Sequence, residues 1–184
     1  MQASKLIIIE SLKIKLLAFP DLVDSLKNKD YNFLALLESW MKETEAILRN
    51  NNIAQCSKIA GFRSKIIAPI FDELRVRSAR KRQLFIASEL LNELQGTILA
   101  VLKPYEIKVN EARDLLIHLL SILKQSGAIK YTDEANFQNF ITQIWKLSSL
   151  HEQLKPITVK ILTLVSQTDV FRIIADEIEI TEWR

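Results

Sequence analysis

Residues 110–127 read NEARDLLIHLLSILKQSG, and this stretch decides the fold class. Apolar residues occupy nearly every position from Leu115 to Leu123, which is typical of a helix that is buried or lies at an interface. Pro104, upstream of the stretch, suits the first turn of a helix, and Gly127 suits a left-handed helix end. The sequence therefore predicts a helix over residues 104–125.

Composition extends this prediction to the whole chain. Its 184 residues fit one domain, and a hydrophobic content of 48% with 26% charged residues supports a sizeable core. There are only 3 Gly and 4 Pro, too few for many tight hairpins or glycine-rich loops. We expect an all-α protein: an antiparallel helical bundle that forms a single helical domain over residues 1–184.

Capping and breaking residues place the other helices. Asp30 is a suitable N-cap, Pro69 is expected to kink or restart its helix, and Thr132 with the acidic residues after it suits a first turn. Asp169 is expected to cap the last helix. The expected helices cover residues 4–19, 31–49, 53 to the break at 69, 70–102, 132–154, 156–165 and 169–178.

The first segment allows two interpretations. Residues 4–19 read SKLIIIESLKIKLLAF, in which Glu10, Lys13 and Lys15 interrupt an apolar run. The run is too short and too charged to span a bilayer alone, which takes roughly 20 apolar residues. The segment is either a core helix or, over residues 1–20, an amphipathic arm for a membrane interface or a subunit contact.

Counting residue types excludes several kinds of site. The single Cys cannot form an internal disulfide, which indicates a reducing compartment. One Cys and two His cannot build a zinc site of the usual composition, and no glycine-rich nucleotide-binding loop is present. We expect neither a metal nor another cofactor.

One group of residues on the 104–125 helix could carry chemistry. Arg113 and His118 lie about 140° apart around a helix with about 7.5 Å of rise between them, so they flank a groove. Asp114 lies one turn before His118, where its carboxylate could accept the ring N–H. Charged groups on such an apolar helix cost free energy unless they are paired or used. The residues either act on a substrate or form an ion-paired cluster that holds helices together.

The motif Arg113-Asp114-x-x-x-His118 in an all-helical protein resembles the HEPN superfamily. This resemblance implies a bundle that dimerises and brings two motifs together, and many such proteins are metal-independent endoribonucleases. It assigns catalytic roles to Arg113 and His118, with Asp114 as the polar residue that follows the arginine. The implied mechanism is physically reasonable because an imidazole moves a proton while a guanidinium stabilises phosphate charge.

The chain resembles one group within that superfamily in its size, its single divergent motif and its apolar, positively charged first segment. These are the small HEPN-like accessory proteins encoded beside the RNA-guided RNA nuclease of type VI-B CRISPR systems. The resemblance implies an antiviral defence enhancer that forms a homo-oligomer in the bacterial inner membrane and permeabilises it, with that nuclease as functional partner and no nuclease activity of its own required. If the chain enters a membrane, several subunits must together shield from the lipid the charged residues that interrupt its apolar stretches.

Two other functions remain open. One is a soluble, cytoplasmic, toxin-like HEPN endoribonuclease, and the other is a helical interaction module with no site. Whether the chain is an enzyme is therefore undecided by the sequence, with the non-enzymatic role slightly favoured.

A second basic feature lies upstream, where residues 75–82 read RVRSARKR. Its five cations are distributed around the helix and do not form one stripe. They are Arg75, Arg77, Arg80, Lys81 and Arg82. A solvated surface, RNA phosphates and anionic lipid head groups are all consistent with this pattern, whereas base stacking lacks support because no aromatic residues are interleaved.

Overall fold

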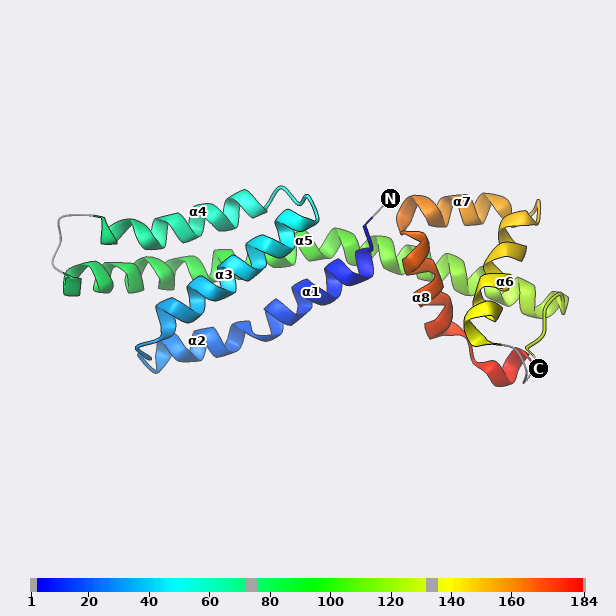
Figure 1. Cartoon of the computed structure of the whole chain (residues 1–184), viewed down its shortest axis with the longest axis horizontal. Helices are drawn as coiled ribbons and strands as arrows, with labels where there is room; N and C mark the ends of the chain where they lie inside the picture. The colour runs from blue at the N-terminus through cyan, green and yellow to red at the C-terminus, as the bar shows by residue number, and fades with distance from the viewer. Residues whose placement is uncertain (1–2, 72–75, 132–135, 184) are drawn as a thin grey trace. The chain divides into compact units, whose positions relative to one another are not determined.

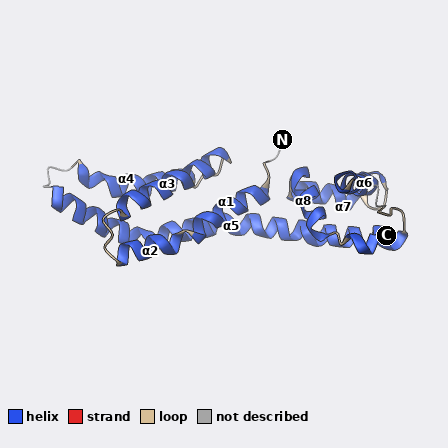
Figure 2. Cartoon of the chain, turned by 60° about the horizontal axis from the view of Figure 1, so that its bottom comes forward, coloured by secondary structure: helices blue, strands red, loops and turns tan. Residues whose placement is uncertain are grey.

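The computed structural model describes residues 3–71, 76–131 and 136–183, and within these ranges every regular element is a helix (Figures 1 and 2). The all-α prediction is confirmed. The α-helices are α1 (Lys5–Leu17), α2 (Phe19–Lys27), α3 (Phe33–Asn50), α4 (Cys56–Ile67), α5 (Val76–Ser126), α6 (Phe137–Leu150), α7 (Lys155–Leu164) and α8 (Gln167–Glu177). Two 3₁₀ turns, η1 (Ala68–Ile70) and η2 (Ile180–Trp183), complete the set.

Packing contacts gather the chain into two compact units. Unit 1 comprises Met1–Leu6 and Tyr105–Arg184, and unit 2 comprises Ile7–Pro104. Both α1 and α5 contribute residues to each unit.

Unit 2 is built around the apolar stripe of α3. Phe33, Leu37 and Met41 repeat at helical spacing and are almost completely buried. The stripe is extended by Trp40, whose ring meets Phe19 edge-on at 5.4 Å and whose Nε1 donates to the carbonyl of Lys15 at 2.9 Å. These contacts join α3 to α1 and α2.

The first helix has two different sides. Ile8, Ile9 and Leu12 are buried, whereas Ile14 and Leu17 are 62% and 78% exposed. One side of α1 therefore belongs to the core, and the other presents apolar side chains to the outside.

The prediction of a helix start at Pro104 is wrong, because α5 continues through it. A proline inside a helix removes one backbone hydrogen bond and clashes with the preceding turn, at a cost of about 3 kcal/mol. Buried Val101 and Leu102 before it, and buried Val109 after it, anchor the helix on both sides. Apolar burial of this extent offsets the local cost.

Other helix ends follow local chemistry more closely. Gly127 adopts a φ of 63° after the end of α5, as predicted, and α4 stops at Ile67 just before Pro69. Asp30 is not the N-cap of α3, because that position belongs to Asn32, whose backbone N–H donates to the Asp30 carboxylate. Thr132 lies outside the described residues, and the helix predicted from residue 132 is described from Phe137 onward.

A buried carboxylate organises unit 1. Asp169 is 1% exposed and accepts hydrogen bonds from the hydroxyl of Ser4, at 2.5 Å, and from the backbone N–H of Lys5, at 2.9 Å. It also accepts from both the backbone and the hydroxyl of Ser166, which is the true N-cap of α8. Asp169 was expected to be the cap of α8 itself. Its carboxylate instead completes the capping box of α8. It also accepts hydrogen bonds from the first backbone N–H groups of α1, which have no partner within that helix.

The same contacts control the charge of Asp169. Burial acts to raise its pKa, but hydrogen bonds from Ser4, Lys5 and Ser166 favour the carboxylate, and the pKa is lowered overall. A lowered pKa in the folded state means that ionised Asp169 stabilises the fold.

We predict that Asp169→Ala lowers the free energy of unfolding by about 2 kcal/mol, because it leaves buried backbone N–H groups at two helix starts without acceptors. In the wild type, the contribution of Asp169 is fully present above the unfolded-state pKa of about 3.9 and is lost as the pH falls toward the folded-state value. Urea unfolding measured between neutral and acidic pH tests both points. A variant whose stability and acid dependence match the wild type would contradict this role.

Candidate functional site

Arg113 of the predicted motif is engaged in ion pairs with α8. Its Nη1 lies 3.2 Å from Oε1 of Glu177, and its Nη2 lies 3.9 Å from Oδ2 of Asp176. Its Nε is buried and has no hydrogen-bond partner. The guanidinium therefore links the second half of α5 to the end of α8 within unit 1.

His118 and Asp114 have a different environment. Both side chains are exposed, and among the described residues neither forms a hydrogen bond or an ion pair. The hydrogen bond expected from the His118 ring to Asp114 is not formed. The neighbouring Leu116 and Leu119 are fully buried, so His118 lies on the outer side of α5, away from the core stripe.

The structure thus does not bring Arg113 and His118 together. Their positions around the helix differ by about 140°, as the sequence indicates, and the ion pairs hold Arg113 against α8. General acid–base chemistry on phosphate needs both groups at the same reacting atoms. One protomer does not provide that geometry.

A pocket of about 200 Å³ lies beside the ion pairs, between α5, α8 and η2. Ile117, Leu120 and Trp183 provide apolar lining, and the polar lining comes from Ser121, Lys124, Glu177 and Glu182. Each carboxylate is matched by a cation, since Glu177 binds Arg113 and Glu182 binds Lys124 at 2.7 Å. This balance leaves no unpaired acid or base in the pocket.

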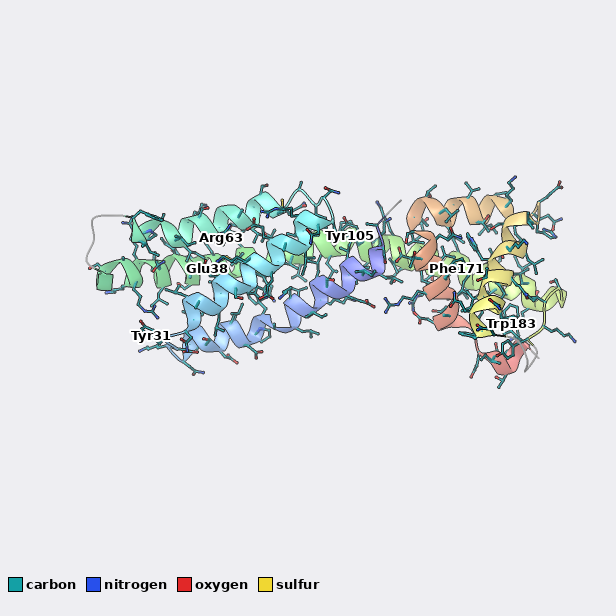
Figure 3. The ribbon with its side chains drawn as sticks, in the orientation of Figure 1. Tyr31, Glu38, Arg63, Tyr105, Phe171 and Trp183 are labelled. Carbon is teal, nitrogen blue, oxygen red and sulfur yellow. The ribbon has the colours of Figure 1, made fainter. Side chains whose placement is uncertain are left out.

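Aromatic contacts hold the C-terminal turn in place. Trp183, labelled in Figure 3, is buried and meets the ring of Phe140 edge-on at 5.7 Å. The backbone N–H of Tyr131 donates to the carbonyl of Trp183 at 2.7 Å, and the Tyr131 ring contacts Phe140. The acidic C-terminal segment is therefore packed within unit 1.

The predicted basic stretch is only partly described. Arg75 lies outside the described residues, and Arg77 is within α5 but its side chain is not described. Lys81 and Arg82 are exposed. The guanidinium of Arg80 lies 4.3 Å from the ring centre of Tyr31 and donates to the Tyr31 carbonyl.

Sequence reasoning missed Tyr31. It precedes Arg80 by 49 residues, so no local pattern connects the two. A search for aromatic residues interleaved with the cations finds none, because tertiary packing supplies the ring from the connection between α2 and α3.

The described residues contain no group of three or more His, Cys, Asp or Glu side chains that could hold a metal ion. One described helix, spanning Ser78–Ser126, is long and apolar enough to cross a membrane by length and composition. Its most apolar window has a mean hydropathy of 1.3 and is 39% buried in the protein. Core helices of soluble proteins meet the same criteria, so this helix is compatible with a membrane without establishing one.

No family model, no curated protein and no solved structure matches this chain.

We predict that substitution of the two motif residues changes the free energy of unfolding by different amounts. Arg113→Ala removes partly exposed ion pairs and should lower the free energy of unfolding by up to about 1 kcal/mol. His118→Ala removes an exposed side chain and should change it by less than about 0.5 kcal/mol. Urea unfolding of both variants provides the measurement. A loss above 1 kcal/mol for His118→Ala would show that the ring has a structural contact.

Proposed function

We propose that the chain is a homo-oligomeric accessory protein of bacterial antiviral defence that assembles at the inner membrane and permeabilises it. In this proposal its helical bundle is HEPN-like, and its functional partner is the RNA-guided RNA nuclease of a type VI-B CRISPR system. The motif residues Arg113 and His118 serve an interface or a gate, with no requirement for catalysis.

The exposed apolar side chains of α5 carry this proposal. Phe85, Leu99, Ile107 and Ile117 are between 45% and 62% exposed on the helix that passes the length and composition test for a membrane span. Single exposed apolar residues are normal on soluble proteins, but their recurrence along this helix favours burial against lipid or another copy. Each square ångström of apolar surface removed from water contributes about 25 cal/mol.

The state of the motif supports assembly over catalysis by a monomer. Arg113 is held by Glu177 and Asp176, and His118 is exposed on another side of α5. An exposed imidazole is available for contact with a second copy. The same exposure favours the second candidate, a soluble dimeric endoribonuclease in which His118 of one copy meets Arg113 of the other.

We predict that the purified chain requires detergent, runs as a large oligomer and releases dye from lipid vesicles. Leu99→Glu and Ile107→Glu should each reduce assembly and dye release at least tenfold, because a carboxylate in an apolar contact is costly. Leu150→Glu is the matched control, since Leu150 is 69% exposed on α6. Size measurement by light scattering and a leakage assay check these outcomes. A detergent-independent monomer that leaves vesicles intact would refute the proposal.

Metal-free RNA cleavage separates the two candidates. We expect no cleavage of a labelled single-stranded RNA in the presence of a chelator. If the wild type does cleave, and His118→Ala reduces the rate by about 10² or more, the chain is a ribonuclease and the accessory function is replaced. His118→Ala is informative here because it is expected to leave the fold unchanged.

A further inference from the structure

One end of unit 2 collects exposed aromatic, aliphatic and cationic side chains. Its members come from the α2–α3 connection, from η1 with the residue after it, and from the start of α5, and both views place these segments at the same end of the unit (Figures 1 and 2). We call it the basic–aromatic end, made of Tyr31, Ile70, Phe71, Lys81, Arg82 and Phe85.

The start of α5 provides the centre of this surface. Ala79 and Ala87 are buried and mark the inner side of the helix, whereas Phe85 is 62% exposed. Lys81 and Arg82 precede Phe85 by four and three residues, so both lie next to it on the outer side. An exposed phenyl ring is thus flanked by two cations.

Tyr31 lies on one flank and is held in position. The guanidinium of Arg80 lies 4.3 Å from the centre of the Tyr31 ring and donates to the Tyr31 carbonyl, yet the tyrosine remains 78% exposed. Tyr31 is labelled in Figure 3. The stack therefore orients the ring without covering it, and it places a further cation at the surface.

The other flank is apolar. Ile70 is 58% exposed and Phe71 is 82% exposed, directly after α4. The side chain of Gln83 on α5 donates to the carbonyl of Ile66 near the end of α4, at 3.1 Å, which keeps the two segments adjacent. Two adjacent large apolar residues are thus exposed at this end of the unit, as is typical of a membrane-interface anchor.

We propose that the basic–aromatic end docks on an anionic lipid surface, with Phe71, Ile70 and Phe85 entering the interfacial region and Lys81 and Arg82 contacting lipid phosphates. This proposal rests on the proposed function and specifies the lipid that the chain recognises. Cations adjoining apolar side chains match an anionic bilayer in both charge and hydrophobicity. A single-stranded RNA matches the charge and the rings, but an aliphatic side chain such as Ile70 offers a base no stacking surface.

Flotation of the full-length chain with vesicles tests the docking directly and needs no permeabilisation. We expect binding to vesicles of phosphatidylcholine mixed with phosphatidylglycerol, and much weaker binding to phosphatidylcholine alone. Lys81→Glu changes the charge by two units and should weaken binding about 25-fold, at about fivefold per charge. Phe71→Ser and Phe85→Ser should each weaken it about tenfold.

Exposed residues of unit 1 provide matched controls. Lys146→Glu on α6 makes the same charge change as Lys81→Glu, and Leu150→Ser replaces an exposed apolar residue by serine, as Phe71→Ser does. Both controls should bind vesicles as the wild type does. Equal binding to the two kinds of vesicle, or equal losses in the variants and the controls, overturns the proposal.

Other outcomes distinguish this proposal from the proposed function. Loss of binding to poly(U) RNA in Lys81→Glu, with vesicle binding unchanged, assigns the surface to RNA and overturns the lipid assignment. Lys81→Glu and Phe71→Ser could instead release dye at wild-type levels, with no preference for anionic lipid. That result overturns the docking proposal but leaves the proposed permeabilising function standing. Docking with the expected variant losses but without dye release confirms the surface and overturns the proposed function.

Discussion

Unit 1 depends on one buried carboxylate that serves two helix starts. The first N–H groups of an α-helix have no partners within the helix, and Asp169 supplies acceptors for α1 and for α8 together. Its hydrogen bonds outweigh the cost of burying the charge, so its pKa is lowered. Burial and nearby Lys108 lower the pKa of Lys5 as well, although Asp169 opposes this. The beginning of the chain is tied to a residue 164 positions away through this one group.

The ion pairs of Arg113 are a second constraint on unit 1, and they change the interpretation of the motif. A guanidinium engaged with Glu177 and Asp176 links α5 to α8, and this contact gives the arginine a structural role in a single copy. His118 is exposed, and the described residues give its side chain no hydrogen-bond or ion-pair partner. A single copy therefore does not bring the two motif groups together, and α1 and α5 also expose several apolar side chains.

Much of the fold could be predicted from the sequence because it follows from local constraints. Scarce glycine and proline with abundant apolar residues indicate helices, and Pro69 and Gly127 end helices through their own backbone geometry. The candidate site could be predicted only as a set of residues on one helix. Sequence spacing placed Arg113 and His118 on one helix, but it held no information about α8, which supplies the partners of Arg113.

The sequence by itself determined the helical class, several helix ends and the face of the helix on which each motif residue lies, because these depend on residues within a turn or two of each other. Tertiary structure decided that α5 continues through Pro104, that Asp169 accepts hydrogen bonds at the start of α1, and that Tyr31 stacks on Arg80. These outcomes depend on free energies summed over contacts between residues far apart in the chain. A local cost such as that of an internal proline is overcome only when such contacts are present.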